Sequence, residues 1–130
     1  MTLAQLRAHC LSLPGSREQM QWVSHLVFKV GGKMYLVASP DDPLQPLTIK
    51  CPPEEFDDAV EMPGIRPAPY MARAKWVQLE TMDTLPSTEL KRWVTRSYEL
   101  VRAKLKKKAQ AQLQASSPAK ARARSKASLP

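Results

Sequence analysis

The sequence has few of the residues that build metal sites, disulfide frameworks or catalytic centres. Its 130 residues include two cysteines and two histidines, with neither a CxxC pair nor a Cys/His cluster. Cys10 and Cys51 stand far apart in the chain. This spacing fits two isolated buried thiols and matches neither a zinc site nor a small secreted scaffold. We therefore expect no metal and no cofactor.

Long apolar runs are also missing. No stretch approaches the roughly 18 apolar residues that a transmembrane helix needs, and residues 1–13 lack the basic start and apolar centre of a secretory signal. We expect a cytoplasmic protein. A chain of this length fits one domain, and its 43% hydrophobic residues, with three Trp, three Tyr and two Phe, are enough for a core.

Acidic residues are absent after Glu99, so charge is unevenly distributed along the chain. Residues 1–103 hold twelve acids and twelve Lys or Arg, which balance, and the net charge of +8 comes from residues 104–130. From about residue 110 the composition falls to Ala, Gln, Ser, Pro, Lys and Arg, with too few apolar side chains to offset the entropy of ordering. We divide the chain into a domain, residues 1–108, and a disordered basic tail, residues 109–130.

Caps, turns and hydrophobic alternation predict the elements of the domain. Thr2 and Gln5 form a capping box, and two consecutive glycines at 31–32 are a hairpin signal because both can take positive φ. Leu26, Phe28 and Val30 alternate with His25, Val27 and Lys29, which predicts one buried and one half-solvated face. In order, we expect a helix over 2–13, strands over 25–30, 33–39 and 47–51, a short helix over 53–61, strands within 65–70 and over 75–80, and a helix from Ser87 to about residue 105. This order of helix, three strands, helix, two strands and helix predicts an α+β fold, with helices packed against one antiparallel sheet.

These residues resemble the MmcQ/YjbR-like family over nearly all of the domain. The likeness rests on a Leu-Pro-Gly turn at 13–15, a Phe-Lys-Val-Gly-Gly-Lys hairpin at 28–33, Ile-Lys-Cys at 49–51, Trp76 and a Ser-Tyr-Glu-Leu-Val run at 97–101. The resemblance implies the same order of elements and a DNA-binding role in which paired hairpins act as wings. Residues 70–75 depart from the family, whose members are often richer in His, Asn and Lys there.

The solvent side of the predicted sheet is the candidate binding surface. The alternation places Lys29 and Lys50 there with His25, Lys33 at the hairpin and Trp76 nearby. Cations beside an aromatic ring could hold phosphates and stack a base. The alternative is that these lysines form a solvated face and that Trp76 packs on the final helix.

The tail supplies the second set of candidate residues. Spaced cations attract polyanions by counterion release whatever the sequence, and the arginines of the last helix, Arg92, Arg96 and Arg102, could extend the tail into one basic ridge. The predicted nucleic-acid-binding residues are Lys29, Lys33, Lys50, Trp76, Lys106, Lys107, Lys108, Lys120, Arg122, Arg124 and Lys126.

We expect a non-enzymatic protein that binds nucleic acid, DNA in the first instance, largely through phosphate contacts. His25 has no nucleophile or carboxylate at a motif spacing, and the acids at 54–58 lack the spacing of a calcium loop and fit a solvated helix. Trp93 and Tyr98 fit core packing of the last helix. Two other classes stay open, a protein-interaction adaptor that uses the sheet face and an enzyme of unknown substrate. A preference for DNA or RNA and the state of assembly also stay open.

Overall fold

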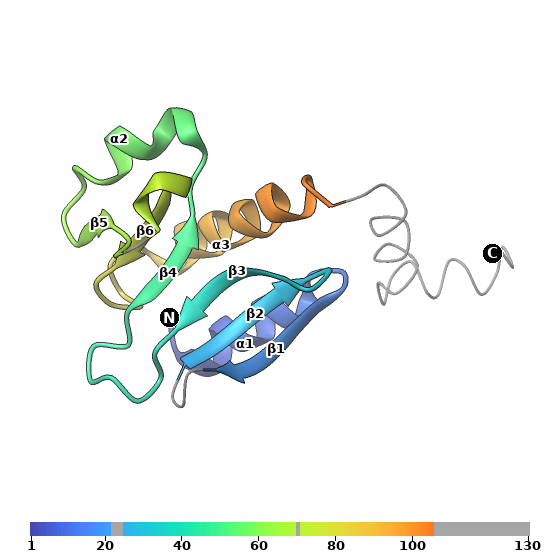
Figure 1. Cartoon of the computed structure of the whole chain (residues 1–130). Helices are drawn as coiled ribbons and strands as arrows, with labels where there is room; N and C mark the ends of the chain where they lie inside the picture. The colour runs from blue at the N-terminus through green and yellow to red at the C-terminus, as the bar shows by residue number, and fades with distance from the viewer. Residues whose placement is uncertain (22–24, 70, 106–130) are drawn as a thin grey trace, which may run out of the picture.

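The computed structural model describes residues 1–21, 25–69 and 71–105. One antiparallel sheet with the strand order β1-β2-β3-β4-β6-β5 organises them, and α1 and α3 pack against the same side of it (Figure 1). This confirms the predicted α+β fold. In chain order the elements are α1 (Leu3–Ser12), β1 (Ser16–Gln21), β2 (His25–Val30), β3 (Lys33–Ala38), β4 (Leu47–Lys50), the 3-10 turn η1 (Pro53–Glu55), α2 (Phe56–Ala59), β5 (Ile65–Pro67), the 3-10 turn η2 (Ala72–Ala74), β6 (Trp76–Leu79) and α3 (Ser87–Arg102).

The local signals at the start of the chain have the geometry that the sequence predicts. Thr2 Oγ1 accepts from the Gln5 N–H at 3.2 Å, and Gln5 Oε1 accepts from the Thr2 N–H at 2.9 Å, which closes the capping box of α1. Gly31 and Gly32 have φ of 58° and 80° and turn β2 into β3.

The strand β1 is an addition to the predicted order. It pairs with β2 along its whole length, from Ser16 opposite Val30 to Gln21 opposite His25. Its sequence, Ser-Arg-Glu-Gln-Met-Gln, has no apolar alternation, because polar contacts hold the positions on the helix side of the sheet. Ser16 Oγ lies 2.6 Å from the Tyr35 hydroxyl, and Glu18 pairs with Arg7 of α1 at 2.5 Å.

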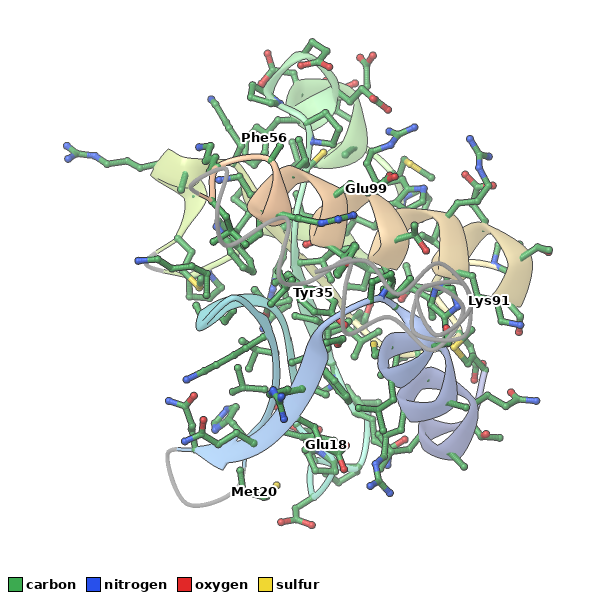
Figure 2. All side chains as sticks on the ribbon, turned by 90° about the vertical axis from the view of Figure 1, so that its right-hand side faces the viewer. Glu18, Met20, Tyr35, Phe56, Lys91 and Glu99 are labelled. Atoms are coloured by element: carbon green, nitrogen blue, oxygen red, sulfur yellow. The ribbon has the colours of Figure 1, made fainter. Side chains whose placement is uncertain are left out.

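The core lies between the sheet and α3, with α1 beside it. The buried side chains of α3 are Leu90, Val94, Ser97, Tyr98 and Val101. The Tyr98 and Tyr35 rings meet edge to face, with their centroids 5.4 Å apart, and the Tyr98 hydroxyl donates to the Pro14 carbonyl at 2.5 Å. Tyr35 lies just below α3 in Figure 2. These contacts join α3 to β3 and to the turn after α1.

The sheet opens between its two central strands. β3 and β4 pair only where Leu36–Ala38 face Leu47–Ile49, so neither the Tyr35 carbonyl nor the Lys50 N–H has a partner on the opposite strand. Ser97 of α3, fully buried, supplies both bonds: its hydroxyl donates to the Tyr35 carbonyl at 2.5 Å and accepts from the Lys50 N–H at 2.9 Å. The end of α3 thereby reaches the space between the β2–β3 hairpin and β4.

The side of the sheet that faces away from α1 and α3 is less solvated than the alternation predicts. Val27 points to that side, opposite Val37, yet Val27 is fully buried and Val37 is 8% exposed. The expectation of a half-solvated face on β2 is wrong at this position. The lysines that the sequence placed on this side consequently do not share one open surface.

Candidate nucleic-acid interface

The opening between β3 and β4 forms a pocket that gathers three of the predicted site residues. The pocket, of about 230 Å³, is lined by Lys33 and Met34 of β3, by Lys50 of β4 and by Trp76 of β6. Val101, Lys104 and Leu105 at the end of α3 complete its described lining. Lys50 and Trp76 stand opposite each other in the β4–β6 ladder. We call this the hairpin pocket.

The electrostatics of the hairpin pocket are dominated by unneutralised lysines. Burial and then the neighbouring Lys104 ammonium lower the pKa of Lys50 below its usual value. No Asp or Glu is among the described residues that line the pocket. In the part of the chain that the structure describes, every ion pair uses an arginine or the chain's amino group, and none uses a lysine. An anion placed here would relieve the repulsion between Lys50 and Lys104.

Trp76 lines this pocket although its side chain is almost fully buried. It is 6% exposed and shares the pocket with Val101 and Leu105 from the end of α3. Of the two interpretations that the sequence left open for Trp76, its burial favours packing beside the final helix over an exposed ring. Only the small exposed part of its side chain is available to a ligand.

Lys29 lies in a different place from the other predicted lysines. It is half-buried on β2 and lines a separate groove with Gly15, Arg17 and Glu18. A β-bulge between Phe28 and Lys29 shifts the register at this point. Lys29 therefore does not join Lys33 and Lys50.

The arginines of α3 do not form a continuous basic ridge. Arg92 pairs with Glu89 at 2.9 Å, and Arg96 pairs with Glu55 of η1 at 2.6 Å. Both guanidinium groups are thus neutralised by a carboxylate, which weakens their attraction for a phosphate. Among the described residues of α3 and its end, the cations outside these ion pairs are Lys91 near its start and Arg102 and Lys104 at its end. The other predicted residues, Lys106, Lys107, Lys108, Lys120, Arg122, Arg124 and Lys126, lie outside the described residues.

His25 and the acidic residues at 54–58 are the other titratable groups considered from the sequence. His25 is half-buried on β2. The acidic residues 54, 55, 57 and 58 are exposed on η1 and α2, where Glu55 holds Arg96. Among residues 1–21, 25–69 and 71–105, no three His, Cys, Asp or Glu side chains gather as a group that could hold a metal ion. No helix within the described ranges is both long and apolar enough to cross a bilayer.

Four residues of the hairpin pocket's described lining were not among the predicted site residues: Met34, Val101, Lys104 and Leu105. Lys104 stood out only as the first cation of the basic C-terminal segment, and Met34 only as one apolar residue of a strand. A Lys one turn after the last buried residue of α3, Val101, is a signal that could have indicated Lys104. No sequence signal indicates that β3 and β4 separate, because the separation depends on where Ser97 of α3 docks.

The fold and the hairpin pocket define a class: a small α+β protein with helices on one side of a single antiparallel sheet and a lysine-lined opening between its two halves. The family model YjbR matches residues 11–100. The chain belongs to the YjbR family, which agrees with the resemblance seen in its sequence. A search of curated proteins finds no match.

Two solved structures are similar to this chain. The crystal structure of Deinococcus radiodurans protein DR2400, a DUF419 domain protein, is 28% identical in sequence and superposes with a TM-score of 0.78, covering 86% of this chain and 87% of that one. A protein from Pseudomonas syringae, 19% identical, superposes with a TM-score of 0.65 and covers 77% of this chain and 98% of its own. The second likeness concerns the fold alone.

Proposed function

We propose that this protein binds nucleic acid, DNA in the first instance, as a non-enzymatic protein that contacts phosphates through lysines at one end of its sheet. The observation that carries this proposal is the hairpin pocket, where Lys33, Lys50 and Lys104 converge without a carboxylate in the described lining. Phosphate groups supply the negative charge that this cluster lacks, and lysine contacts of this kind position a nucleic acid without reading its sequence.

The position of the tail supports the same proposal. The described chain ends at Leu105, whose side chain lies against the hairpin turn at Gly31. Lys106, Lys107 and Lys108 come directly after it in the sequence. The described chain thus ends at the lining of the hairpin pocket, and we propose that the cations that follow in the sequence contact the same polyanion as the pocket does.

The test is a salt-dependent titration of the full-length protein with duplex DNA, single strands and RNA. Replacing Lys33 and Lys104, both exposed, by Gln should weaken binding and make the slope of log K against log [salt] shallower by about 0.9 for each duplex phosphate that is no longer neutralised. The matched control replaces Arg66 and Lys91, exposed cations that line other parts of the surface, by Gln. It removes the same charge.

The two variants must differ for the proposal to stand. We expect the control to retain the slope of the unmodified protein. If both variants shift affinity and slope equally, only net charge matters and the pocket has no part in binding. If the unmodified protein binds none of the three nucleic acids at low salt, this proposal is wrong and the protein-interaction adaptor becomes the favoured alternative.

A further inference from the structure

We propose that the hairpin pocket receives the phosphorylated end of a nucleic-acid strand, with a terminal phosphate monoester between Lys50 and Lys104 and the adjoining base against the apolar wall. This inference rests on the proposed function and deepens it by naming the part of the strand that enters the pocket.

The size of the pocket excludes a paired duplex. Its volume of about 230 Å³ lies below the roughly 300–1,000 Å³ of clefts that enclose drug-sized ligands. Two stacked base pairs of a duplex are far larger than this space. A nucleotide can therefore enter only where it is unpaired, and the end of a strand is where pairing and stacking are weakest.

The charges select a monoester over the internal phosphates of the chain. An internal phosphodiester carries one negative charge, whereas a terminal monoester carries about −1.5 to −2 at neutral pH and has three acceptor oxygens. Lys50 and Lys104 are close enough for the Lys104 ammonium to lower the pKa of Lys50. A doubly charged group neutralises both lysines together, while a diester leaves one of them without a counter-charge.

The rest of the lining suits the base. Met34, Trp76 and Leu105 give the pocket an apolar wall, and Met adapts its shape to flat ligands through its flexible, polarizable side chain. Such a wall favours any base, because every base has a π-face, and it does not read base identity. We therefore expect recognition of the strand end with little dependence on sequence.

The experiment compares one short DNA strand in three forms, with a 5′-phosphate, with a 3′-phosphate and with hydroxyl groups at both ends. Binding is followed by the fluorescence of a full-length variant in which Trp22 and Trp93 are replaced by Phe, so that Trp76 is the sole tryptophan. We expect one phosphorylated form to bind roughly tenfold more tightly than the hydroxyl form, the effect of about one charge-assisted hydrogen bond. Which form gains affinity identifies the end that enters.

Substitutions link this gain to the pocket. Lys50→Met should abolish the tenfold difference, and Lys104→Met should do the same. Lys104 is exposed and lies outside β4, so its replacement tests the pocket even if the Lys50 variant folds poorly. Lys91→Met on the far part of α3 should keep the difference in full. A gain that persists in both pocket variants overturns the inference.

The outcomes separate this inference from the proposed function. Equal binding of the three strands, with affinity still dependent on Lys33 and Lys104, overturns the strand-end pocket and leaves nucleic-acid binding intact. Absence of binding for all three strands and for duplex DNA at low salt overturns both. Inorganic phosphate should compete with the phosphorylated strand and leave the hydroxyl strand largely bound.

Discussion

At the scale of single residues, Ser97 has the largest structural consequence. It is the one buried polar residue in the described ranges, and its hydroxyl replaces the ladder hydrogen bonds where β3 and β4 part. A buried carbonyl or N–H without a partner costs more than an average hydrogen bond contributes. The width of the hairpin pocket thus depends on one hydroxyl group.

Replacing Ser97 by Ala should lower the free energy of unfolding by roughly 1–3 kcal/mol, because the Tyr35 carbonyl and the Lys50 N–H lose their shared partner. Urea denaturation measures this loss. The control is Ser87→Ala, an exposed position on the same helix, where we expect a change within about 0.5 kcal/mol. Equal stability of the two variants would show that water or a local shift provides hydrogen bonds to the Tyr35 carbonyl and the Lys50 N–H without Ser97.

At the scale of elements, the β2–β3 hairpin and the end of α3 act together. A Cβ built on Gly31 would lie 2.5 Å from Leu105 Cδ1, whereas one built on Gly32 would meet nothing within 4 Å. Both glycines have positive φ, so both carry the same backbone requirement. Gly31 is therefore required both for its positive φ and for the space that Leu105 occupies, whereas Gly32 is required for its positive φ alone.

Gly31→Ala should destabilise the protein more than Gly32→Ala does. Each substitution carries about 1–2 kcal/mol for an L side chain in the left-handed region, and only the first also displaces Leu105. Thermal or urea unfolding of both variants gives the difference. In a Leu105→Ala background, which removes the clash, the two glycine variants should become equal. A difference that survives in that background would refute the contact.

Prediction from sequence was uneven among the elements, for physical reasons. The hairpin and α3 carry strong local signals, a Gly pair and an amphipathic period, and both were predicted. β1 was not, because an edge strand needs little apolar surface and its inward positions bond to Arg7 and Tyr35. Polar partners from other elements leave no alternation in the strand itself.

At the scale of the whole molecule, charge is distributed unevenly between the domain and the C-terminal segment, which gives them different parts in the proposed binding. Residues 1–103 are neutral overall, and several of their charges are paired within the fold. Residues 104–130 contain eight Lys or Arg and no acid. We therefore expect residues 104–130 to provide the long-range attraction for a polyanion and the hairpin pocket to provide the local contacts.

Removing residues 109–130 should reduce duplex affinity and make its salt dependence shallower, by about 0.9 in slope for each phosphate that the tail neutralises. A control keeps the full length and replaces the tail cations by Gln; these are Lys120, Arg122, Arg124 and Lys126. We expect both proteins to change alike, because charge rather than length attracts the polyanion. Unchanged affinity and slope in the shortened protein would remove the tail from the binding model.

The sequence by itself determined the fold class, the family, the capping box of the first helix and the concentration of positive charge at the C-terminus. These depend on short-range spacing and composition, which any stretch of chain carries within itself. Only the tertiary structure decided which lysines meet. Lys29 and Lys50 both sit on predicted strands, yet Lys29 lines a groove beside β1, whereas Lys50 lies at the opening between β3 and β4, where the end of α3 brings Lys104 close to it. Contacts between residues far apart in the chain depend on how the helices and strands pack together, and this packing is set by many residues in all of these elements at once.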